Sequence, residues 1–349
     1  MTRMTGTHKR VPAHALQSAR GTEVWTPRSA PMPNMMEDIA CPLCGARDAT
    51  AFATANDDLT GKPGDFTFVR CRTCRLTYQN PRIRLEHIGI YYDEDYIAHR
   101  RKTQWGWLTP FYRRAMDKLD YRKLALIKHY MDISPQCRIL DVGCGAGSFL
   151  ALARRHHGAS VDGLDFKDLS DLPWMHDVCF HRGLFYEKSF SGHRFDLITM
   201  WHFLEHDYEP LRSLRHAAKL LDEGGLLIVE VPNLDSWTRA FFGDRWPGLQ
   251  APQHTVLFDY NSLEAMAYRA GLEIVAHLSY GAFPSYFYLF AGIAFQILKG
   301  RGLNLDKAIL PYFAGQLLLA PVLIFERYLN LAMQTIICRK AVEQKGSAQ

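Results

Sequence analysis

Short apolar runs and amphipathic helical stretches alternate along residues 134–280. The runs CRILDVG and ASVDGLD are typical of buried β-strands, and stretches with a helical period separate the apolar runs that follow. Strands that alternate with helices of about 10–15 residues predict a parallel, doubly wound, Rossmann-like sheet of the α/β class. The expected strands are 137–143, 159–165, 177–183, 195–201 and 224–233, with helices at 146–157 and 207–221.

The pattern changes between residues 262 and 340. Residues 262–280 predict a helix, a glycine turn and a strand, and 330–340 predicts a last strand, so the sheet should have seven strands with helices on both faces. Two uncharged apolar runs, Ala282–Leu298 and Ala308–Phe325, stand between these strands. We therefore expect an apolar helical hairpin inserted before the last strand.

The remaining sequence divides by composition. The N-terminal stretch is rich in Pro, Ser, Thr, Arg and Met without apolar periodicity, which predicts a disordered segment or an extension upstream of the true start. Turn-rich sequence with paired cysteines follows, and then a helical linker or cap. The expected boundaries are 1–36 for the first stretch, 37–85 for the cysteine module, 86–133 for the linker, 134–281 for the core, 282–326 for the hairpin, and 327–349 for the last strand and tail.

The composition of the 349 residues is that of a globular protein, with 48% hydrophobic and 22% charged residues. The net charge of +5 comes mostly from the first 36 residues, so the folded part lacks the basic surface of a nucleic-acid-binding protein. Eight cysteines are too few for a disulfide scaffold, and no apolar segment typical of a secretory signal follows the basic N-terminus. These features predict a cytoplasmic protein with reduced thiols.

The clearest candidate ligand site is the run DVGCGAG, Asp141 to Gly147, between a strand and a helix. Its alternate glycines allow a tight turn and close approach of a ligand, and the helix N-terminus offers free N–H groups. Asp165 ends the next strand, where a carboxylate can accept both ribose hydroxyls of an adenosine. A dinucleotide and S-adenosylmethionine both suit such a loop. The acidic Asp141 would repel a pyrophosphate and attract the amine of a methionine moiety, which favours S-adenosylmethionine.

With its neighbours, this loop resembles the ILDVGCGxG loop of the class I S-adenosylmethionine-dependent methyltransferases of bacteria. The stretches FDLITMWHFLEH, LLDEGGLLIVEVPN and RAGLEIV, which begin at 195, 220 and 269, are similar to that family in the same order. The resemblance implies that 134–281 is a methyltransferase core. It assigns the cofactor to Asp141, Gly143, Cys144, Gly145, Gly147 and Asp165, with Leu184 beside the adenine and Trp201 in the segment that lines the pocket.

Residues WHFLEH follow the fourth strand, at the carboxyl edge where ligands of doubly wound sheets bind. The stretch resembles the family segment that lines the cofactor and acceptor pocket, which makes His202, Glu205 and His206 candidate catalytic residues. The two histidines are four apart and should share a helix face, an arrangement that also allows metal binding. Helix capping and packing is the alternative role for His206.

A second catalytic candidate lies in the loop after the fifth strand. The P-x-H pattern ending at His254, followed by Phe258, is similar to related methyltransferases in which that histidine faces the acceptor. A histidine with a pKa near its ordinary value accepts a hydroxyl proton at neutral pH, so His254 is our first candidate for a general base. The alternative is a histidine that fastens the loop through hydrogen bonds.

Four cysteines form two C-x-x-C pairs separated by 26 residues: Cys41 and Cys44, and Cys71 and Cys74. Two such turns complete a tetrahedral site of four thiolates for a structural Zn²⁺, which would make 37–85 a zinc-binding module. It also resembles the zinc-bearing N-terminal segment of sugar C-methyltransferases and related bacterial enzymes. A redox pair is the alternative, although no thioredoxin-like pattern surrounds either pair. We expect the methyltransferase core to keep its fold without the metal.

These features predict a methyltransferase that modifies an oxygen or carbon of a glycan, a lipid-linked precursor or a small metabolite. A non-catalytic, methyltransferase-like binding or scaffold protein is the alternative. The hairpin 282–326 predicts peripheral contact with the inner face of the cell membrane, because each run would span about 26 Å as a helix, short of a hydrocarbon core of about 30 Å. An extra helical layer or a homodimer interface is the alternative for the hairpin.

Overall fold

The computed structural model describes residues 31–92, 109–190, 192–299, 301–303 and 305–341, and the expectations for 1–30 and 93–108 lie outside these ranges. Residues 33–36 are folded, whereas the sequence predicted disorder or an upstream extension over 1–36. The turn η2 (Pro33–Met35) leads into β1 (Met36–Glu37), which pairs with β5 (Arg82–Ile83), and Met35 is buried. Residues 33–37, just upstream of the cysteine module, are therefore part of the folded structure.

The central sheet has seven strands in the order β12-β13-β10-β9-β6-β7-β8, which confirms the predicted Rossmann-like α/β fold. The chain runs from β6 outward to β8 and returns on the other side of β6 at β9, so the carboxyl ends of β6 and β9 flank the switch point where such sheets bind ligands. Only β13 is antiparallel to its neighbours. The strands are β6 (Arg138–Val142), β7 (Ser160–Asp165), β8 (Cys179–Arg182), β9 (Phe195–Trp201), β10 (Leu221–Pro232), β12 (Leu272–Leu278) and β13 (Met333–Lys340).

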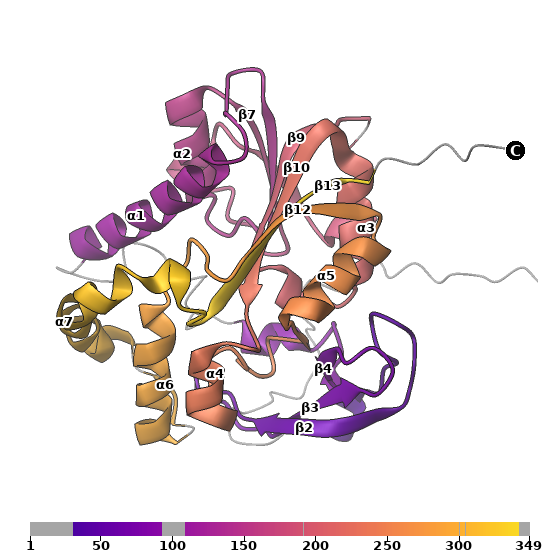
Figure 1. The fold of residues 1–349 in the computed structure, drawn as a ribbon, viewed down its shortest axis with the longest axis vertical. Helices are drawn as coiled ribbons and strands as arrows, with labels where there is room; N and C mark the ends of the chain where they lie inside the picture. The colour runs from indigo at the N-terminus through magenta and orange to yellow at the C-terminus, as the bar shows by residue number, and fades with distance from the viewer. Residues whose placement is uncertain (1–30, 93–108, 191, 300, 304, 342–349) are drawn as a thin grey trace, which may run out of the picture.

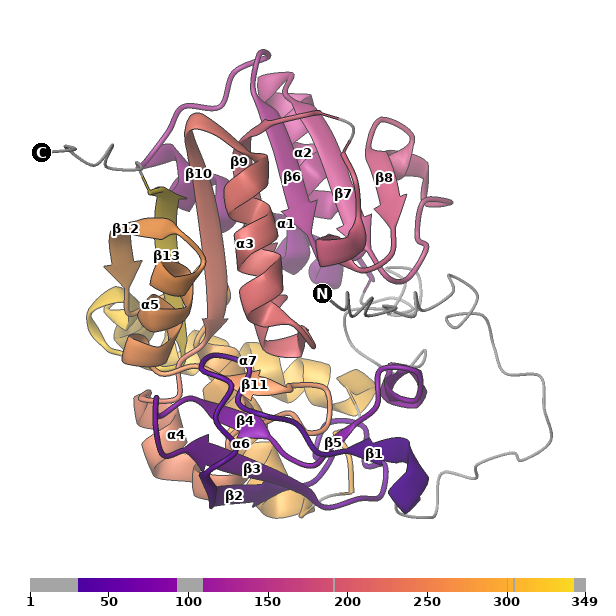
Figure 2. The same ribbon diagram turned by 90° about the vertical axis from the view of Figure 1, so that its right-hand side faces the viewer.

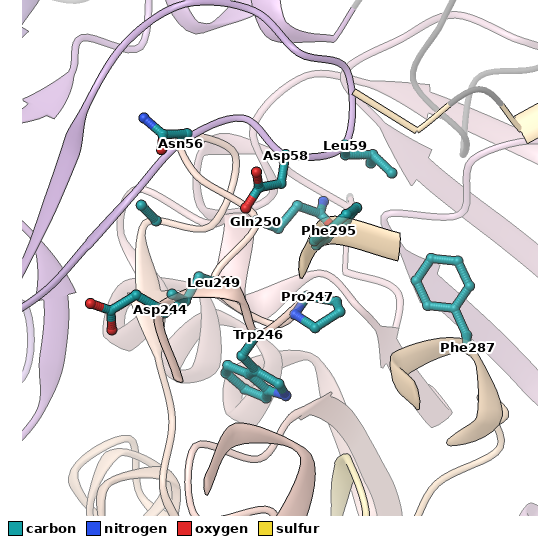
Figure 3. Close-up of a pocket in the computed structure, with 11 residues that line it drawn as sticks. Asn56, Asp58, Leu59, Asp244, Trp246, Pro247, Leu249, Gln250, Phe287 and Phe295 are labelled. Carbon is teal, nitrogen blue, oxygen red and sulfur yellow. The ribbon is translucent and has the colours of Figure 1, made fainter. Parts of the chain in front are cut away.

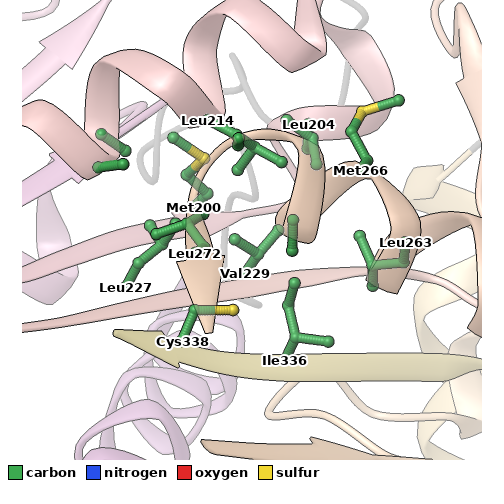
Figure 4. Packing of buried hydrophobic residues seen from close by; sticks show 14 of the residues in the cluster. Met200, Leu204, Leu214, Leu227, Val229, Leu263, Met266, Leu272, Ile336 and Cys338 are labelled. Carbon is green, nitrogen blue, oxygen red and sulfur yellow. The ribbon is translucent and has the colours of Figure 1, made fainter. Parts of the chain in front are cut away.

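Helices cover both faces of this sheet (Figures 1 and 2). On one face, α1 (Thr109–Lys128) and α2 (Ser148–His157) bury Ile127 and Phe149. On the other, α3 (Pro210–Leu220) and α5 (Tyr260–Arg269) bury Leu214, Leu263 and Met266 over Met200, Val229 and Ile336 of the strands (Figure 4). Helix α5 starts at a capping box in which the Asp259 carboxylate accepts the Ser262 N–H.

The cysteine module is joined to the core. Its strands β2 (Ala49–Ala55), β3 (Phe66–Cys71) and β4 (Thr77–Gln79) form one four-stranded sheet with β11 (Val256–Leu257), which comes from the core. Cys41, Cys71 and Tyr78 belong to the same buried cluster as Phe258 and Leu263. Because this cluster and this sheet are shared, the structure does not show the module as a separate unit.

The apolar hairpin lies between β12 and β13, as expected from the sequence. It consists of α6 (Tyr286–Leu298) and α7 (Leu305–Leu323), followed by η10 (Glu326–Tyr328). Helix α6 packs on α4 (Trp237–Phe242), where a side chain at Gly292 would collide with the ring of Phe242. Tyr312 of α7 packs on Tyr286 and Phe290. In the described part of the chain, no helix is both long and apolar enough to cross a membrane.

Short 3-10 turns complete the described structure, and two of them carry candidate catalytic residues or lead to them. The turn η8 (Leu204–His206) follows β9, and η9 (Gly243–Arg245) opens the loop that leads to His254. The others are η3 (Ile88–Tyr91), η6 (Pro173–Met175) and η7 (Phe185–Glu187).

Candidate active site

The glycine loop after β6 has the backbone conformation that its sequence predicts. Gly143, Gly145 and Gly147 have φ of +77°, +50° and +66°, a region that favours glycine. A side chain at Gly143 would collide with Phe203, whereas a Cβ at Gly145 would meet nothing within 4 Å. Gly145 therefore faces open space at the carboxyl edge of the sheet, where a ligand can approach the backbone closely.

Two buried carboxylates flank this loop. The Asp165 carboxylate accepts the N–H groups of Gly145 at 2.8 Å and Lys167 at 3.0 Å, and Asp141 accepts the Thr199 hydroxyl at 2.6 Å. Burial raises the pKa of Asp165 and raises that of Asp141 to about 7. Such carboxylates suit a ligand that brings a positive charge and hydroxyl donors, as the methionine amine and ribose of S-adenosylmethionine do.

Cys144, Leu184 and Trp201, the other residues expected to bind the cofactor, differ from one another in where their side chains lie. The Cys144 sulfur points toward β7, because a Cβ on Gly163 would come within 2.9 Å of it, so only the Cys144 backbone lies in the loop. Leu184 is half-buried just before η7. Trp201 is buried at the end of β9, and its indole N–H has no hydrogen-bond partner among the described residues. Trp201 thus offers a donor at the edge where the loop lies.

Helix α1 adds a charged pair that our sequence reasoning missed. The Lys123 ammonium lies 3.5 Å from the buried Asp120 carboxylate and 5.4 Å from the centre of the Trp201 ring. Its positive charge opposes the effect of burial on the pKa of Asp141. The signal in the sequence was a charged pair three residues apart on a helix that also buries Leu124 and Ile127.

His202 is held as a cation between two carboxylates. It has a left-handed φ of +53° and precedes the 3-10 turn, so it does not share a helix face with His206, contrary to our expectation. Its Nε2 lies 3.1 Å from Glu230, and its Nδ1 lies 3.4 Å from Glu205. Burial lowers the pKa of His202, but the two carboxylates outweigh burial and raise it to about 9. A histidine that is already protonated cannot act as a base at neutral pH.

His206 and His254 are neutral and lie together, with ring centres 4.5 Å apart. The Nδ1 of His206 lies 3.0 Å from the carbonyl oxygen of Gln253, and that of His254 lies 2.8 Å from the carbonyl of Gly248. Because a carbonyl only accepts, each Nδ1 carries the hydrogen and each Nε2 keeps a lone pair. Burial lowers the pKa of His206 and lowers that of His254 to about 3, so our expectation of an ordinary pKa for His254 was wrong.

Glu205 completes this group. Its carboxylate is 1% exposed, and its Oε2 has no hydrogen-bond partner among the described residues. Burial raises the pKa of Glu205, but the neighbouring His202 cation outweighs burial and leaves it lowered. A carboxylate oxygen of Glu205 and one ring nitrogen each of His206 and His254 lie within 4.8 Å of one another. We call these three residues the acceptor-side cluster: two neutral imidazoles beside a buried carboxylate.

The acceptor-side cluster borders the cofactor loop through two aromatic residues. Phe203, three residues before His206, packs against Gly143. The Tyr92 hydroxyl lies 2.9 Å from the His206 Nδ1, and the Tyr92 ring packs on Phe166, which follows Asp165. A molecule at the cluster would therefore lie next to a cofactor in the loop.

The four cysteines of the N-terminal module form a second candidate site. They are not joined by disulfides, and the sulfur of Cys41 lies 3.4 Å from that of Cys74, as Cys44 lies 3.5 Å from Cys71. Tetrahedral zinc with Zn–S bonds of about 2.3 Å needs sulfurs about 3.8 Å apart, so the set fits a metal of that size. The two turns are alike, since Gly45 and Arg75 each donate an N–H to the carbonyl of the first cysteine and each have positive φ.

A small pocket lies away from both groups, between the cysteine module, the loop after η9 and helix α6 (Figure 3). Asn56 and Asp58 line it from the module, Trp246 and Pro247 from the loop, and Phe295 from α6. None of the expected cofactor or catalytic residues lines it, so this cavity does not mark the chemistry.

A family model described as a methyltransferase domain matches residues 92–277, which is more than half of the chain. The chain therefore belongs to this family. The fold and the glycine loop place it among the class I S-adenosylmethionine-dependent methyltransferases, as the sequence resemblance implied.

Similar proteins include two enzymes called ubiquinone biosynthesis O-methyltransferase. That of Coxiella burnetii (strain Dugway 5J108-111) is 34% identical over 102 residues, covering 27% of this chain and 43% of the relative. That of Vibrio cholerae serotype O1 is 35% identical over 96 residues, covering 25% and 39%. The matches thus span less than half the length of these curated relatives. A putative sarcosine dimethylglycine methyltransferase from Galdieria sulphuraria has a similar structure, with a TM-score of 0.44, 15% identity, and coverage of 73% of this chain and 96% of that one.

Proposed function

We propose that this protein transfers the methyl group of S-adenosylmethionine to a hydroxyl oxygen of a small-molecule or lipid-linked acceptor. The observation that carries the proposal is the acceptor-side cluster, in which two neutral imidazoles and an ionised carboxylate border the cofactor loop. An oxygen acceptor must lose a proton, and this cluster supplies groups that can take one. The curated relatives are named O-methyltransferases, which agrees with oxygen as the methylated atom.

The cofactor, when bound, supplies an activated methyl group, so the main task of the protein is to position the acceptor. We assign the ribose to Asp165 and the methionine amine to Asp141, with the backbone of Gly145 against the cofactor. His206 is the better placed of the two neutral histidines, because it is half-buried whereas His254 is 3% exposed. The hydroxyl proton then passes to Nε2 of His206, and the Glu205 carboxylate stabilises the imidazolium that forms.

The test compares His206→Asn and His254→Asn with His129→Asn, which alters an exposed histidine outside the site. Methyl transfer from radiolabelled S-adenosylmethionine is measured on a panel of phenols, catechols, sugars and polyprenyl-linked hydroxyls. Loss of a general base lowers the rate by about 100-fold or more. We expect that loss in His206→Asn, with cofactor affinity by calorimetry within about twofold of wild type. A carbon-methylated product, or unchanged transfer in both site variants, would refute the proposal.

We also propose a structural Zn²⁺ at Cys41, Cys44, Cys71 and Cys74. The support is the spacing of the four sulfurs and the likeness of the two turns. Elemental analysis of protein purified without chelator should find one zinc per chain. Cys71→Ser should reduce this content, and Cys137→Ser, which changes a cysteine outside the cluster, should not.

A lipid-linked acceptor agrees with the surface of the hairpin. Leu317 and Leu318 of α7 are 78% and 80% exposed, and Ile297 of α6 is 73% exposed. An exposed helix face is normally polar, so an apolar one indicates a partner surface. The exposed cations Lys299 and Arg301 between the two helices suit anionic lipid headgroups. We propose that the hairpin lies on a membrane surface and brings the acceptor-side cluster to a lipid-linked substrate.

A further inference from the structure

The cysteine cluster and His254 are connected by a single pair of short strands. Strand β4 begins three residues after Cys74, and β11 begins two residues after His254. The two strands pair antiparallel, with Tyr78 opposite Val256 and Thr77 opposite Leu257. Short chain segments therefore lead from the metal ligands to the acceptor-side cluster.

Gln79, the last residue of β4, contacts the His254 backbone directly. Its N–H donates to the carbonyl of Thr255 at 2.8 Å, and its side-chain amide donates to the carbonyl of His254 at 3.3 Å. Gln79 is fully buried, so water does not compete for these bonds. The cysteine module thus holds two successive carbonyl groups of the loop.

Thr255, which follows His254, also binds the turn that carries Glu205 and His206. The N–H of Thr255 donates to the carbonyl of Glu205 at 2.8 Å, and the Thr255 hydroxyl donates to the carbonyl of Asp207 at 2.8 Å. The backbone of His254 and Thr255 is therefore held between the cysteine module and the rest of the acceptor-side cluster. The cofactor loop is held elsewhere, by the carbonyl of Leu164 and the carboxylate of Asp165.

Strand β4 directly follows the second C-x-x-C turn, so its position depends on the geometry of that turn. The Cys71 N–H donates to the carbonyl of Leu76 at 2.9 Å, and Arg75 takes a left-handed φ of +68° that a non-glycine residue adopts only when its surroundings hold it. Tyr78, on the same strand, is fully buried. Four metal–sulfur bonds would fix this turn and, with it, the start of β4.

We infer that the metal-bound cysteine cluster holds the His254–Thr255 segment against the turn that carries Glu205 and His206 and so keeps the acceptor-side cluster in place for methyl transfer, with Gln79 as the positioning residue and the cofactor loop unaffected. The inference rests on the zinc and the acceptor-side cluster proposed above. It differs from our sequence-based expectation, in which the metal stabilised its own module alone. The consequence is that loss of metal impairs the acceptor side while cofactor affinity is retained.

The first test uses the full chain with its metal. Gln79→Met keeps the length and apolar stem of the side chain but removes the amide donor. Thr77→Val is the matched control, because Thr77 lies on the same strand and its side chain contacts Arg70 instead of the loop. In hydrogen exchange followed by mass spectrometry, residues 244–258 of Gln79→Met should exchange at least about tenfold faster than wild type, and 139–165 should not change. The methyl-transfer rate should fall at unchanged cofactor affinity and metal content.

The second test removes the metal by chelation or by Cys71→Ser, with Cys137→Ser as the control. We expect the same faster exchange at 244–258 and unchanged calorimetric affinity for S-adenosylmethionine. Unchanged exchange at 244–258 in either test would overturn the inference, and so would an equal change at 139–165. If the purified protein contains no metal, the zinc assignment is refuted. Faster exchange in Gln79→Met would then show that Gln79 holds the His254 segment without a metal.

Discussion

Glu230 binds His202 and the start of the apolar hairpin with one carboxylate. Its Oε1 lies 3.1 Å from Nε2 of His202, and its two oxygens accept the N–H groups of Ala282 at 2.5 Å and Phe283 at 3.0 Å. The Phe283 ring also packs on His202, with ring centres 4.7 Å apart. A buried charge near the carboxyl end of β10 therefore connects the turn that carries the acceptor-side residues to the hairpin.

The first prediction concerns Glu230→Gln. The amide cannot balance the His202 cation, and its NH₂ group would face an N–H of the hairpin. Breaking a buried ion pair from one side costs about 3–5 kcal/mol, so we expect a loss of that order in the free energy of unfolding. Urea unfolding measures it, with Glu223→Gln, at an exposed position of the same strand, as the control. Equal losses in the two variants would contradict the role given to Glu230.

The second prediction is that stability falls on the alkaline side. The pKa of His202 is raised from 6.5 to about 9, so the folded state binds this proton more tightly than the unfolded state. The contribution is complete below pH 6.5 and is lost as the pH rises to about 9, by up to about 3 kcal/mol. Unfolding in urea from about pH 6 to about pH 10 measures the slope. Glu230→Gln should flatten it, and a slope that persists there would assign the effect to another group.

The third prediction concerns Asp165→Ala. In our assignment, the substitution removes the acceptor for the ribose hydroxyls and also the bond that holds Gly145. A hydrogen bond to a charged group contributes about 1.5–3 kcal/mol, so cofactor affinity should fall about tenfold to 100-fold. Asp168→Ala is the matched control, because Asp168 is an exposed acid three residues further along whose carboxylate accepts the N–H and the hydroxyl of Ser170. Calorimetry that finds wild-type affinity in Asp165→Ala would exclude this ribose contact.

The fourth prediction is that cofactor affinity depends on pH through Asp141. Burial raises the pKa of this carboxyl to about 7, so below that value most of the free protein carries it neutral. Only the ionised form attracts the methionine amine, and affinity should therefore increase about tenfold per unit as the pH approaches 7 from below. The affinity should level off above about pH 7, where Asp141 is ionised, and fall again above about pH 8 as the amine itself loses its proton. Asp141→Asn should bind weakly at every pH, and a strong pH dependence in that variant would assign the effect to another group.

The sheet and the glycine loop could be predicted because their signals are local. The strand expected at 195–201 matches β9, since a run of apolar residues forms a buried strand whatever its partners are. The expected helix at 207–221 starts instead at Pro210, which occupies the first turn because it has no N–H to donate. The first run of the hairpin becomes helical only at Tyr286, because the N–H groups of Ala282 and Phe283 are bound by Glu230.

The roles of the histidines could not be predicted in this way, because they depend on residues distant in sequence. His202 is a cation because Glu230, 28 residues later, faces it. His254 is neutral because its loop is buried under the cysteine module. The sequence did contain one unused signal, since a lone acid in LLIVEVP must find a partner when that strand is buried. A histidine at the end of the neighbouring parallel strand is the natural partner for such an acid, and His202 occupies that position.

The last prediction tests the surface of the hairpin, in which α6 packs on α7 on one side and on α4 on the other (Figure 1). Leu317→Glu with Leu318→Glu places two charges on the exposed face of α7 without changing its buried contacts with α6. If this face lies in anionic phosphatidylglycerol vesicles, each leucine contributes up to about 1.5–3 kcal/mol, and the double variant should bind at least about tenfold more weakly. Tyr268→Glu, at an exposed position of α5, is the control and should bind as wild type. High salt should weaken the binding of wild type, because Lys299 and Arg301 attract the headgroups.

Wild-type protein that does not sediment with vesicles would refute the membrane contact. A dimer in light scattering that the double variant abolishes would show instead that a second copy of the chain covers this face.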